Sequence, residues 1–428
     1  MTRVLILGGG GREHALAWSC ARGHDDLELI CAPGNGGTAS IAENIAVDVT
    51  DAAAVARLAR EREVDLVVIG PDAAAAAGVA DACIAENIAV FGPTAAAARI
   101  ESSKAFAKQL MESARIPTAS WVAGTAGERT RLSAFIREHA GRCAVKADGL
   151  ALGKGVIVCG SVDEAEAALS RCIDDGAFGA AGAAVVVEER LDGEEVSVLA
   201  LSDGTHLRVL PPARDHKRAF DGDRGPNTGG MGAVTPPPRI DARLIGDITS
   251  RVLQPCIDAL RERGTPFIGC LYAGLMLTAD GPRVLEFNAR FGDPEAQVVL
   301  PVLAEPLLPL LTAGVRRDLT PGSVRVARAA AVGVVAAAAG YPGTPRTGDV
   351  IEGLEDVAAD ALVFHAGTHR DAGGALRTSG GRVLCVVATG DGLQTASASA
   401  YENLRRVRFD GMQYRTDIGG ATVAALTR

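Results

Sequence analysis

The first hundred residues alternate short apolar segments with helix-forming segments, and the apolar segments lead into loops rich in glycine or proline. We expect strands at residues 4–7, 27–31, 66–69 and 89–91, with helices at 13–21 and 52–61 between them. Asp51 is a good N-cap for the second helix. Strands separated by helices predict an α/β fold with a parallel, doubly wound sheet, and ligands bind such sheets at the carboxyl ends of the strands. The loops at those ends are residues 8–12, 32–38, 70–72 and 92–94.

The remainder of the chain divides into further parts. A helix from Ser102 leads to Pro117, and a second α/β unit runs to about residue 189. A mixed segment at about 191–325 holds the densest unusual motifs, and a strand at 329–337 opens a glycine-rich C-terminal unit. With 428 residues the chain is long enough for two to four domains, each with its own core.

The composition excludes several classes of protein. The chain has 52 acidic and 43 basic side chains and is 48% hydrophobic, which excludes a disordered chain and argues against a general nucleic-acid or membrane binder. Nine cysteines without a CxxC pair fit buried thiols in a reducing compartment and argue against a zinc site. No signal-peptide segment or membrane-length apolar run is found, so we expect a cytoplasmic protein.

The first glycine-rich loop, residues 8–11, follows a strand and opens a helix, where backbone N–H groups favour an anion. Glu13 or His14 stands where a dinucleotide fingerprint needs its third glycine, and the second strand lacks the terminal acid, so a nicotinamide dehydrogenase is disfavoured. The loop is either a phosphate cradle with Arg12 or a tight turn beside a solvated arginine.

Residues 145–156 place a glycine-rich turn between two strands. Lys146 ends the first strand, and Lys154 with the N–H groups of the turn could cover a polyphosphate. The P-loop motif is absent. A plain β-hairpin with surface lysines is the alternative.

Residues 185–195 run from an apolar strand into a cluster of acids. Acceptors at that point could bind an adenine amino group and ribose hydroxyls. A solvated acidic turn explains the pattern equally well.

Glu286 and Asn288 stand two apart in a predicted strand and therefore point to the same face, with Arg290 on that face too. Two hard oxygen ligands side by side suit Mg²⁺ that bridges phosphates. A buried strand explains this pattern poorly, because its polar side chains would need partners.

A basic cluster at residues 215–218 precedes a glycine-rich loop at 225–232, and together they could bind anionic substrates. No histidine has zinc-ligand spacing. His216 is expected to be a local hydrogen-bonding residue rather than a general base.

Taken together, these motifs resemble the ATP-grasp ligases, and among them the phosphoribosylamine–glycine ligases, or glycinamide ribonucleotide synthetases. The resemblance covers essentially the whole chain, from residues 10–18 to 414–419. The motifs between them are at 32–35, 103–106, 146–150, 215–218, 225–233, 271–276, 286–295, 346–349, 364–368 and 380–386.

The resemblance implies four domains. They are an N-terminal phosphoribosylamine-binding domain at 1–103, a lid at 121–190, a central α+β ATP-grasp domain at 104–120 plus 191–325, and a small, mainly β C-terminal domain at 326–428. The lid and the central domain would clasp ATP between two sheets.

The resemblance also implies roles for single residues. The ATP contacts would be Lys104, Lys146, Gly149, Gly153, Lys154, Gly155, Glu188, Glu189, Leu191 and Glu195, with Glu286 and Asn288 as ligands of Mg²⁺ (or Mn²⁺). The substrate contacts would be Gly10, Gly11, Arg12, Glu13, Asn35, Asp72, Asp215, Lys217, Asn227, Thr228, Gly229, Gly230, Arg290, Gly292 and Asp293. Lys146, Arg290 and Asp293 would be catalytic, and Asp293 would grip the glycine ammonium or the incoming amine.

The implied reaction joins glycine to 5-phosphoribosylamine through glycyl phosphate, with ATP as co-substrate, and gives glycinamide ribonucleotide in de novo purine biosynthesis. The implied partners are these small molecules, with no nucleic acid or membrane, in a monomer or weak homo-oligomer. Two alternatives stay open: an ATP-grasp ligase with a different amine acceptor, and a nucleotide-binding regulatory protein without chemistry. Glu286, Asn288 and Arg290 argue against the second.

Three positions depart from the family pattern. Asp72 stands where a glutamate is usual, which shortens the reach of the carboxylate. Leu152 occupies a flap position that is usually small, and Thr235 replaces a serine-bearing stretch.

Overall fold

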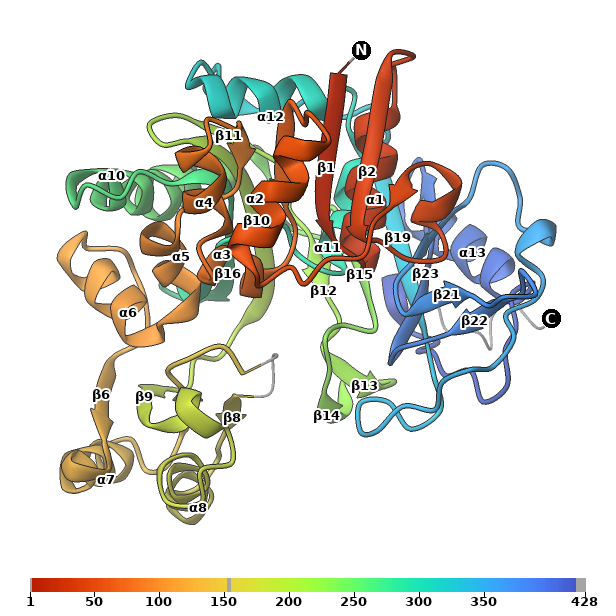
Figure 1. Cartoon of the computed structure of the whole chain (residues 1–428). Helices are drawn as coiled ribbons and strands as arrows, with labels where there is room; N and C mark the ends of the chain where they lie inside the picture. The colour runs from red at the N-terminus through yellow and green to blue at the C-terminus, as the bar shows by residue number, and fades with distance from the viewer. Residues whose placement is uncertain (1, 152–154, 421–428) are drawn as a thin grey trace.

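Figure 1 shows the computed structural model of the chain, which describes residues 2–151 and 155–420. It contains three five-stranded sheets and one four-stranded sheet. The four-stranded sheet and its two helices form a lobe set apart from the body, at the lower left of the view (Figure 1). No helix in the described part of the chain has the length and apolar character needed to cross a membrane.

The N-terminal sheet is parallel throughout, in the order β3-β2-β1-β4-β5. Its strands are β1 (Thr2–Gly8), β2 (Leu27–Pro33), β3 (Glu43–Asn44), β4 (Leu66–Ile69) and β5 (Val90–Phe91). Its helices are α1 (Gly11–Ala21), α2 (Ala52–Glu61), α3 (Asp72–Ala76) and α4 (Val79–Ala85). Leu5 and Leu7 share one core with α2 and α4, whereas Val4 and Ile6 share the other with α1. The predicted doubly wound sheet is confirmed, and Asp51 caps α2 by accepting a hydrogen bond from the backbone N–H of Ala54.

Leu16 on α1 is fully buried against this sheet, so shortening it should leave a cavity. We expect Leu16→Ala to lower the free energy of unfolding by about 2–5 kcal/mol. Ile84→Ala is the matched control, because Ile84 on α4 is 54% exposed and should change stability by less than about 0.5 kcal/mol. Denaturant unfolding followed by circular dichroism measures both, and equal losses would contradict the packing described.

Two helices lead from this sheet to the lid, α5 (Ala95–Ser102) and α6 (Lys104–Ser113). The sequence predicted only the second. Thr94 caps α5 and Ser103 caps α6. The lid sheet is antiparallel in the order β6-β9-β7-β8. It consists of β6 (Trp121–Thr125), β7 (Cys143–Ala147), β8 (Val156–Val158) and β9 (Ala184–Glu189), with α7 (Arg129–Glu138) and α8 (Val162–Ile173) packed on it.

The central sheet has the order β17-β16-β10-β11-β18. Its strands are β10 (Glu194–Asp203), β11 (Leu207–Val209), β16 (Ile268–Thr278), β17 (Gly281–Asn288) and β18 (Gly322–Ser323). The associated helices are α9 (Ala242–Ile248), α10 (Gln254–Glu262), α11 (Glu295–Val299) and α12 (Leu307–Arg316), with a π-helical turn at Thr249–Leu253. A separate hairpin, β13 (Arg218–Phe220) and β14 (Arg224–Asn227), projects from the body beside the lid (Figure 1).

The last five-stranded sheet is antiparallel in the order β12-β15-β19-β23-β20. Its strands are β12 (Arg214–Asp215), β15 (Gly232–Thr235), β19 (Ala330–Ala337), β20 (Leu362–His365) and β23 (Arg382–Gly390), covered by α13 (Leu393–Leu404). A small hairpin adds β21 (Thr368–Arg370) and β22 (Leu376–Thr378). Because β12 and β15 precede residue 326, this sheet joins two segments of the chain. The residue limits of the four domains stay a prediction.

Candidate active site

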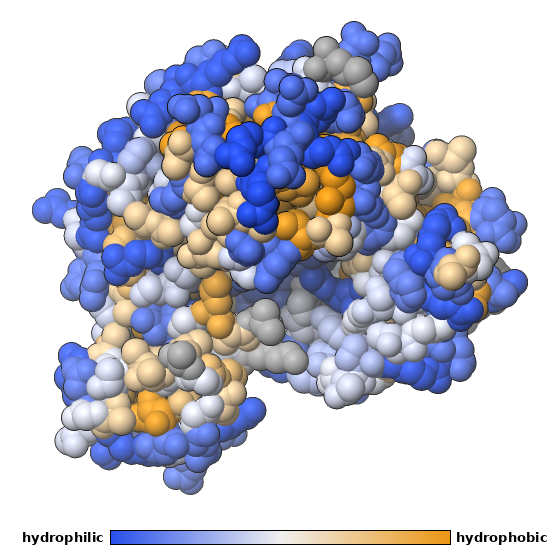
Figure 2. All heavy atoms as spheres, in the orientation of Figure 1, coloured by the Kyte–Doolittle hydropathy of each residue, from blue (hydrophilic) through white to orange (hydrophobic). Residues whose placement is uncertain are grey.

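A cavity of about 760 Å³ lies between the lid and the body. It is lined by residues of the lid sheet, the central sheet and the C-terminal sheet, with helices α3 and α5 contributing from the N-terminal unit. Figure 2 shows that face of the molecule hollowed between the lid and the C-terminal part. Many of the predicted site residues meet here. They are Asp72, Lys104, Lys146, Gly155, Glu188, Glu189, Leu191, Glu195, Asp215, Lys217, Asn227, Thr228, Gly229, Glu286, Asn288, Arg290 and Asp293.

Other predicted site residues do not line this cavity. They are Gly10, Gly11, Arg12, Glu13, Asn35, Gly149, Gly230 and Gly292. Gly153 and Lys154, and Leu152 beside them, lie outside the described residues, so their predicted roles in the flap stay predictions.

The lysines and acids of the cavity form a mixed charge cluster. Lys146 on β7 donates a hydrogen bond to the Leu285 carbonyl at 2.9 Å and forms an ion pair with Glu188. Lys104, at the start of α6, approaches the Gly149 carbonyl at 3.4 Å, and burial lowers its pKa. These cations lie where a polyphosphate would be neutralised.

Glu286 and Asn288 lie two residues apart at the end of β17 and both line the cavity, as the strand spacing predicted. Burial alone would raise the pKa of Glu286, but the surrounding cations outweigh it and hold the pKa below its ordinary value. Those cations are Lys217, Lys146, Lys104 and Arg290. The donor set, a carboxylate and an amide oxygen, fits Mg²⁺ or a similar hard cation.

Within the described ranges, no group of three or more His, Cys, Asp or Glu side chains could hold a metal ion by itself. A cation at Glu286 and Asn288 would therefore need further oxygen ligands, and nucleotide phosphates are the usual source. This arrangement suits a metal that arrives with a nucleotide rather than a fixed protein cage.

Arg290 follows β17 and lies in the loop after it. Its Nη2 is 3.1 Å from Glu101 Oε1 and 3.3 Å from Asn288 Oδ1, and its Nη1 donates to the Phe291 carbonyl at 3.2 Å. Its Nε is buried and has no hydrogen-bond partner among the described residues. Burial would lower the pKa of Arg290, but Glu101 and the other acids raise it, so the guanidinium is charged and has a donor to spare.

Asp293 is held by two side chains that the sequence did not single out. Arg382 on β23 donates to Asp293 Oδ2 at 2.9 Å, and Gln297 on α11 donates to Asp293 Oδ1 at 2.7 Å. Arg382 also donates to the Gly229 carbonyl at 2.6 Å. Burial would raise the pKa of Asp293, but Arg382, Arg12, Gln297 and Arg290 together outweigh it and lower that pKa, so the carboxylate is ionised.

The first glycine-rich loop packs beside Asp293 from the N-terminal unit. A Cβ on Gly10 would lie 2.7 Å from Glu13 Oε2 and 3.5 Å from Asp293 Oδ2, and a Cβ on Gly11 would lie 2.6 Å from Gln297 Nε2. A larger side chain at either position would therefore displace polar groups beside Asp293. Glycine at both positions thus lets the loop pack closely against Glu13 and Gln297.

The polar side chains of this loop are engaged by the protein itself. Glu13 accepts hydrogen bonds from the Gly10 N–H at 2.7 Å and from Arg12 Nε at 2.6 Å. Asn35 Nδ2 donates to the Gly9 carbonyl at 3.0 Å and to the His365 carbonyl at 2.8 Å. In this structure these side chains fix the loop, and their predicted contacts with substrate stay predictions.

Another side of the cavity carries a second set of acids. Lys217 forms an ion pair with Glu195 at 2.9 Å. Burial raises the pKa of Asp215 to about 7, although the positive charge of Lys217 acts to lower it. Glu295 Oε1 accepts a hydrogen bond from the Tyr272 hydroxyl at 2.9 Å. Asp215 can therefore hold or accept a proton at the cavity wall.

His216 lines the cavity close to these acids. Burial lowers its pKa to about 4, so the ring is neutral, and its Nδ1 has no hydrogen-bond partner among the described residues. Its backbone N–H donates to Gly232 and its carbonyl accepts from Met231. Among the described residues, the local hydrogen bonds of His216 are thus made by its backbone.

The acids of the 185–195 segment are partnered. The Glu188 carboxylate is buried between Lys146 and Lys108. Glu189 accepts hydrogen bonds from the Ser120 N–H at 3.1 Å and from Arg283 at 3.3 Å, which ties the lid to the body.

The cavity also has apolar walls that the motifs did not reveal. Val156 and Val158 come from β8 of the lid, whereas Met276 and Leu285 come from β16 and β17 of the central sheet. Val158 is 50% exposed. Apolar side chains contributed by two sheets suit a flat ring such as a purine base.

Of the charged residues near the cavity that sequence reasoning did not single out, Glu295 and Arg382 lay inside motifs noted in the sequence. Glu101 and Lys108 gave no signal, because they are single charges on helices that a solvated face would explain.

Three family models match the chain. They are the N domain of phosphoribosylglycinamide synthetase at residues 2–101, its ATP-grasp (A) domain at 102–296 and its C domain at 331–421. A phosphoribosylamine–glycine ligase of Streptomyces coelicolor is 50% identical over 99% of this chain and 100% of its own length. The human trifunctional purine biosynthetic protein adenosine-3 is 45% identical over 99% of this chain, which corresponds to 42% of that protein.

Solved structures agree with the sequence relatives. The crystal structure of a phosphoribosylamine–glycine ligase from Thermotoga maritima has a TM-score of 0.85 at 34% identity and covers 97% of this chain and 100% of that one. The biotin carboxylase domain of a 2-oxoglutarate carboxylase from Hydrogenobacter thermophilus has a TM-score of 0.74 at 15% identity, over 96% of this chain and 91% of that one, and shares the fold. The chain belongs to the phosphoribosylglycinamide synthetase family.

Proposed function

We propose that this chain is a ligase that uses ATP to join glycine to 5-phosphoribosylamine, with glycinamide ribonucleotide, ADP and phosphate as products, in purine biosynthesis. The observation that carries the proposal is the meeting of Lys104, Lys146, Glu286, Asn288 and Arg290 in one cavity. Family membership supports the choice of substrates. An ATP-grasp ligase with another acceptor is the second candidate.

ATP would lie between the lid and the central sheet. The apolar side chains of β8 and β17 would enclose adenine, and backbone groups near Glu188 and Leu191 would contact its edge. Glu195 would contact the ribose, and Lys104 and Lys146 would neutralise the phosphates. The chain uses a divalent metal, and we propose Mg²⁺ or Mn²⁺ with Glu286 and Asn288 as its protein ligands. When bound, the ion would offset charge on the phosphate oxygens.

The glycine carboxylate is a poor acyl donor, because its leaving group would be oxide. In the first step a carboxylate oxygen attacks the γ-phosphorus, the bond to the β,γ-bridging oxygen breaks, and ADP leaves. In the second step the amine of phosphoribosylamine attacks the acyl carbon of glycyl phosphate, loses a proton and expels phosphate. Positioning and charge neutralisation supply the catalysis, and we assign both to Arg290 and Lys146.

Asp293, fixed by Arg382 and Gln297, would bind the glycine ammonium or the incoming amine. The glycine-rich loop at residues 8–11 and Asp72 would face the phosphoribosyl end. Closure of the lid would keep water from the acyl phosphate. We expect a monomer or weak homo-oligomer.

Oxygen-18 labelling tests the two steps. With glycine labelled in both carboxylate oxygens, the proposed route transfers one label to the released phosphate and leaves one in the amide product. Mass spectrometry of both products measures the transfer, with phosphoribosylamine generated in the assay. Unlabelled phosphate would contradict the acyl phosphate.

The amine dependence of product formation separates the two candidate ligases. Ligation that requires phosphoribosylamine supports the proposal, whereas equal ligation of other amines supports the second candidate. Absence of ADP release with all substrates present would contradict both.

A further inference from the structure

The chain contains only five lysines, at positions 104, 108, 146, 154 and 217, although it has 43 basic residues in all. The four lysines in the described part of the chain all line the cavity. Three of these four have a proposed role toward ATP or substrate. Lys108 is the one whose role the proposed function leaves open.

Lys108 is buried on α6, with 3% of its side chain exposed. Its ammonium forms an ion pair with Glu188 on β9 and donates a hydrogen bond to Thr118 Oγ1 at 2.7 Å. The Thr118 hydroxyl in turn donates to the Val284 carbonyl at 2.6 Å, so Lys108 is fixed against β17. Burial lowers the pKa of Lys108 to about 8, and Glu188 opposes this effect, so the ammonium is charged at neutral pH.

Glu188 is shared between two lysines. Its carboxylate, on the lid sheet, contacts Lys108 through one oxygen and Lys146 through the other. Ala144 is directly opposite Glu188 in the β7–β9 pairing, so Lys146 is its diagonal neighbour on the same face. Two cations therefore face one buried carboxylate, which leaves one positive charge uncompensated within this cluster.

We propose that Lys108 is a positioning residue for nucleotide binding, which neutralises Glu188 so that Lys146 is available to the phosphates. This inference rests on the proposed function, because it assumes that ATP phosphates bind beside Lys146. Without Lys108, Glu188 would have Lys146 as its remaining lysine partner. Lys146 would then have to leave an otherwise unpaired buried carboxylate in order to meet a phosphate, and buried unpaired charges are strongly disfavoured.

The test compares four proteins: the wild type, Lys108→Met, Glu188→Gln, and the double variant. Calorimetry would measure the affinity of each for a non-hydrolysable ATP analogue, for ADP and for adenosine, at constant Mg²⁺. We expect Lys108→Met to weaken the binding of the two phosphorylated ligands by about tenfold or more, which corresponds to the loss of about one charge-assisted hydrogen bond. The binding of adenosine should weaken by less than about twofold. The double variant should bind the ATP analogue as tightly as Glu188→Gln does.

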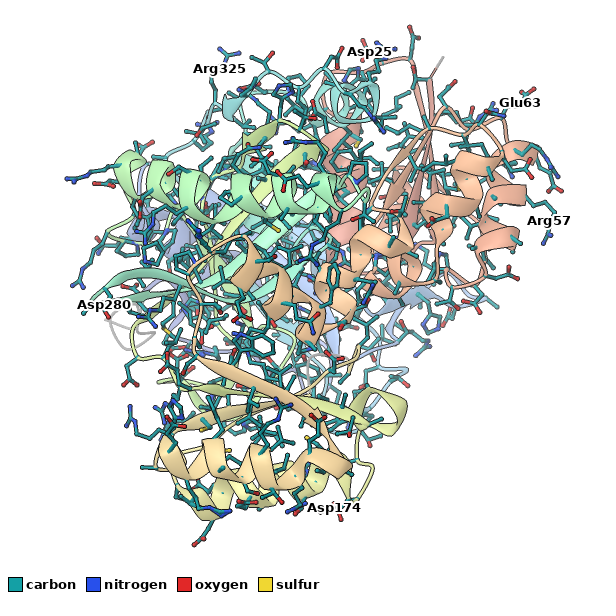
Figure 3. The ribbon with its side chains drawn as sticks, turned by 90° about the vertical axis from the view of Figure 1, so that its left-hand side faces the viewer. Asp25, Arg57, Glu63, Asp174, Asp280 and Arg325 are labelled. Atoms are coloured by element: carbon teal, nitrogen blue, oxygen red, sulfur yellow. The ribbon has the colours of Figure 1, made fainter. Side chains whose placement is uncertain are left out.

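Arg57→Met is the matched control, because it removes an exposed cation on α2 that does not line the cavity. Arg57 lies on the upper part of the body, away from the lid (Figure 3). If Lys108 had a purely structural role, Lys108→Met would weaken the binding of adenosine as much as that of the ATP analogue. If Lys108 contacted a phosphate directly, the double variant would bind the ATP analogue more weakly than Glu188→Gln does. Either result would overturn the inference.

If Lys108→Met alone fails to fold, Glu188→Gln and the double variant can still be compared, because neither contains an unpaired Glu188 carboxylate. Weaker binding of the ATP analogue by the double variant than by Glu188→Gln would then show a direct phosphate contact and overturn the inference. A wild type that does not bind the ATP analogue would instead refute the proposed function.

Discussion

Glu286→Gln is expected to lower kcat by at least about a thousandfold while the protein stays folded. Glutamine keeps the shape of the side chain and one oxygen, but it removes the negative charge that a divalent cation requires. Several kcal/mol of transition-state stabilisation come from such a cation in phosphoryl transfer, and this energy corresponds to the expected loss of rate. The structure supports an ionised Glu286, since the cations around it lower its pKa.

The measurement is glycine-dependent ADP release, titrated with Mg²⁺. In Glu286→Gln, the metal concentration for half-maximal rate should rise along with the loss of kcat. Asp280→Asn is the matched control, because Asp280 is 81% exposed in the turn between β16 and β17 and points away from the body (Figure 3). A kcat within tenfold of wild type in Glu286→Gln, with unchanged metal dependence, would refute its role as a ligand.

The position of Glu286 and Asn288 could be predicted because strand geometry is local. Alternate residues of a strand share a face, and Phe287 between them is buried, as the pattern required. The same reasoning predicted the parallel N-terminal sheet and the two strands that begin and end the segment around Lys146. In each case neighbouring residues determine both the element and the direction of its side chains.

The partners of those residues could not be predicted, because they come from distant segments. Arg382 reaches Asp293 across 89 positions, and Glu101 reaches the N–H of Ala289 across 188. A buried glutamate near a helix end looks in sequence like a solvated one. Only the packing of α5 against β17 brings Glu101 into contact with Ala289 and Arg290.

The ion-pair partners of the acidic segment could not be predicted from the sequence either. The cluster around Glu188 and Glu189 suggested free acceptors for a nucleoside, but both carboxylates have cationic partners supplied by other elements. Nothing local to residues 185–195 indicates Lys108 or Arg283. Sequence therefore identified the residues of the site better than it identified their partners.

Arg290→Lys should lower kcat by about a hundredfold to a thousandfold, although the charge is retained. The guanidinium contacts Glu101, Asn288 and the Phe291 carbonyl and still has its buried Nε available. An ammonium is a compact charge without this planar fork, so it cannot keep those contacts and also present a donor to the cavity. Removal of one preorganised hydrogen-bond donor to a developing oxyanion typically lowers kcat by about this factor.

Steady-state kinetics and the affinity for a non-hydrolysable ATP analogue separate this effect from a loss of binding. We expect the affinity of Arg290→Lys to change by less than about fivefold, because Lys104 and Lys146 still neutralise the phosphates. Arg251→Lys is the control, since Arg251 is 48% exposed on the body and pairs with Asp247. If Arg290→Lys retained kcat within tenfold, the charge alone would be sufficient. If its affinity fell in proportion to kcat, the guanidinium would act on ATP binding. Either result would contradict a catalytic role for the planar fork. A selective loss of kcat would mean that Arg290 acts on the charge that develops during transfer and not on bound ATP.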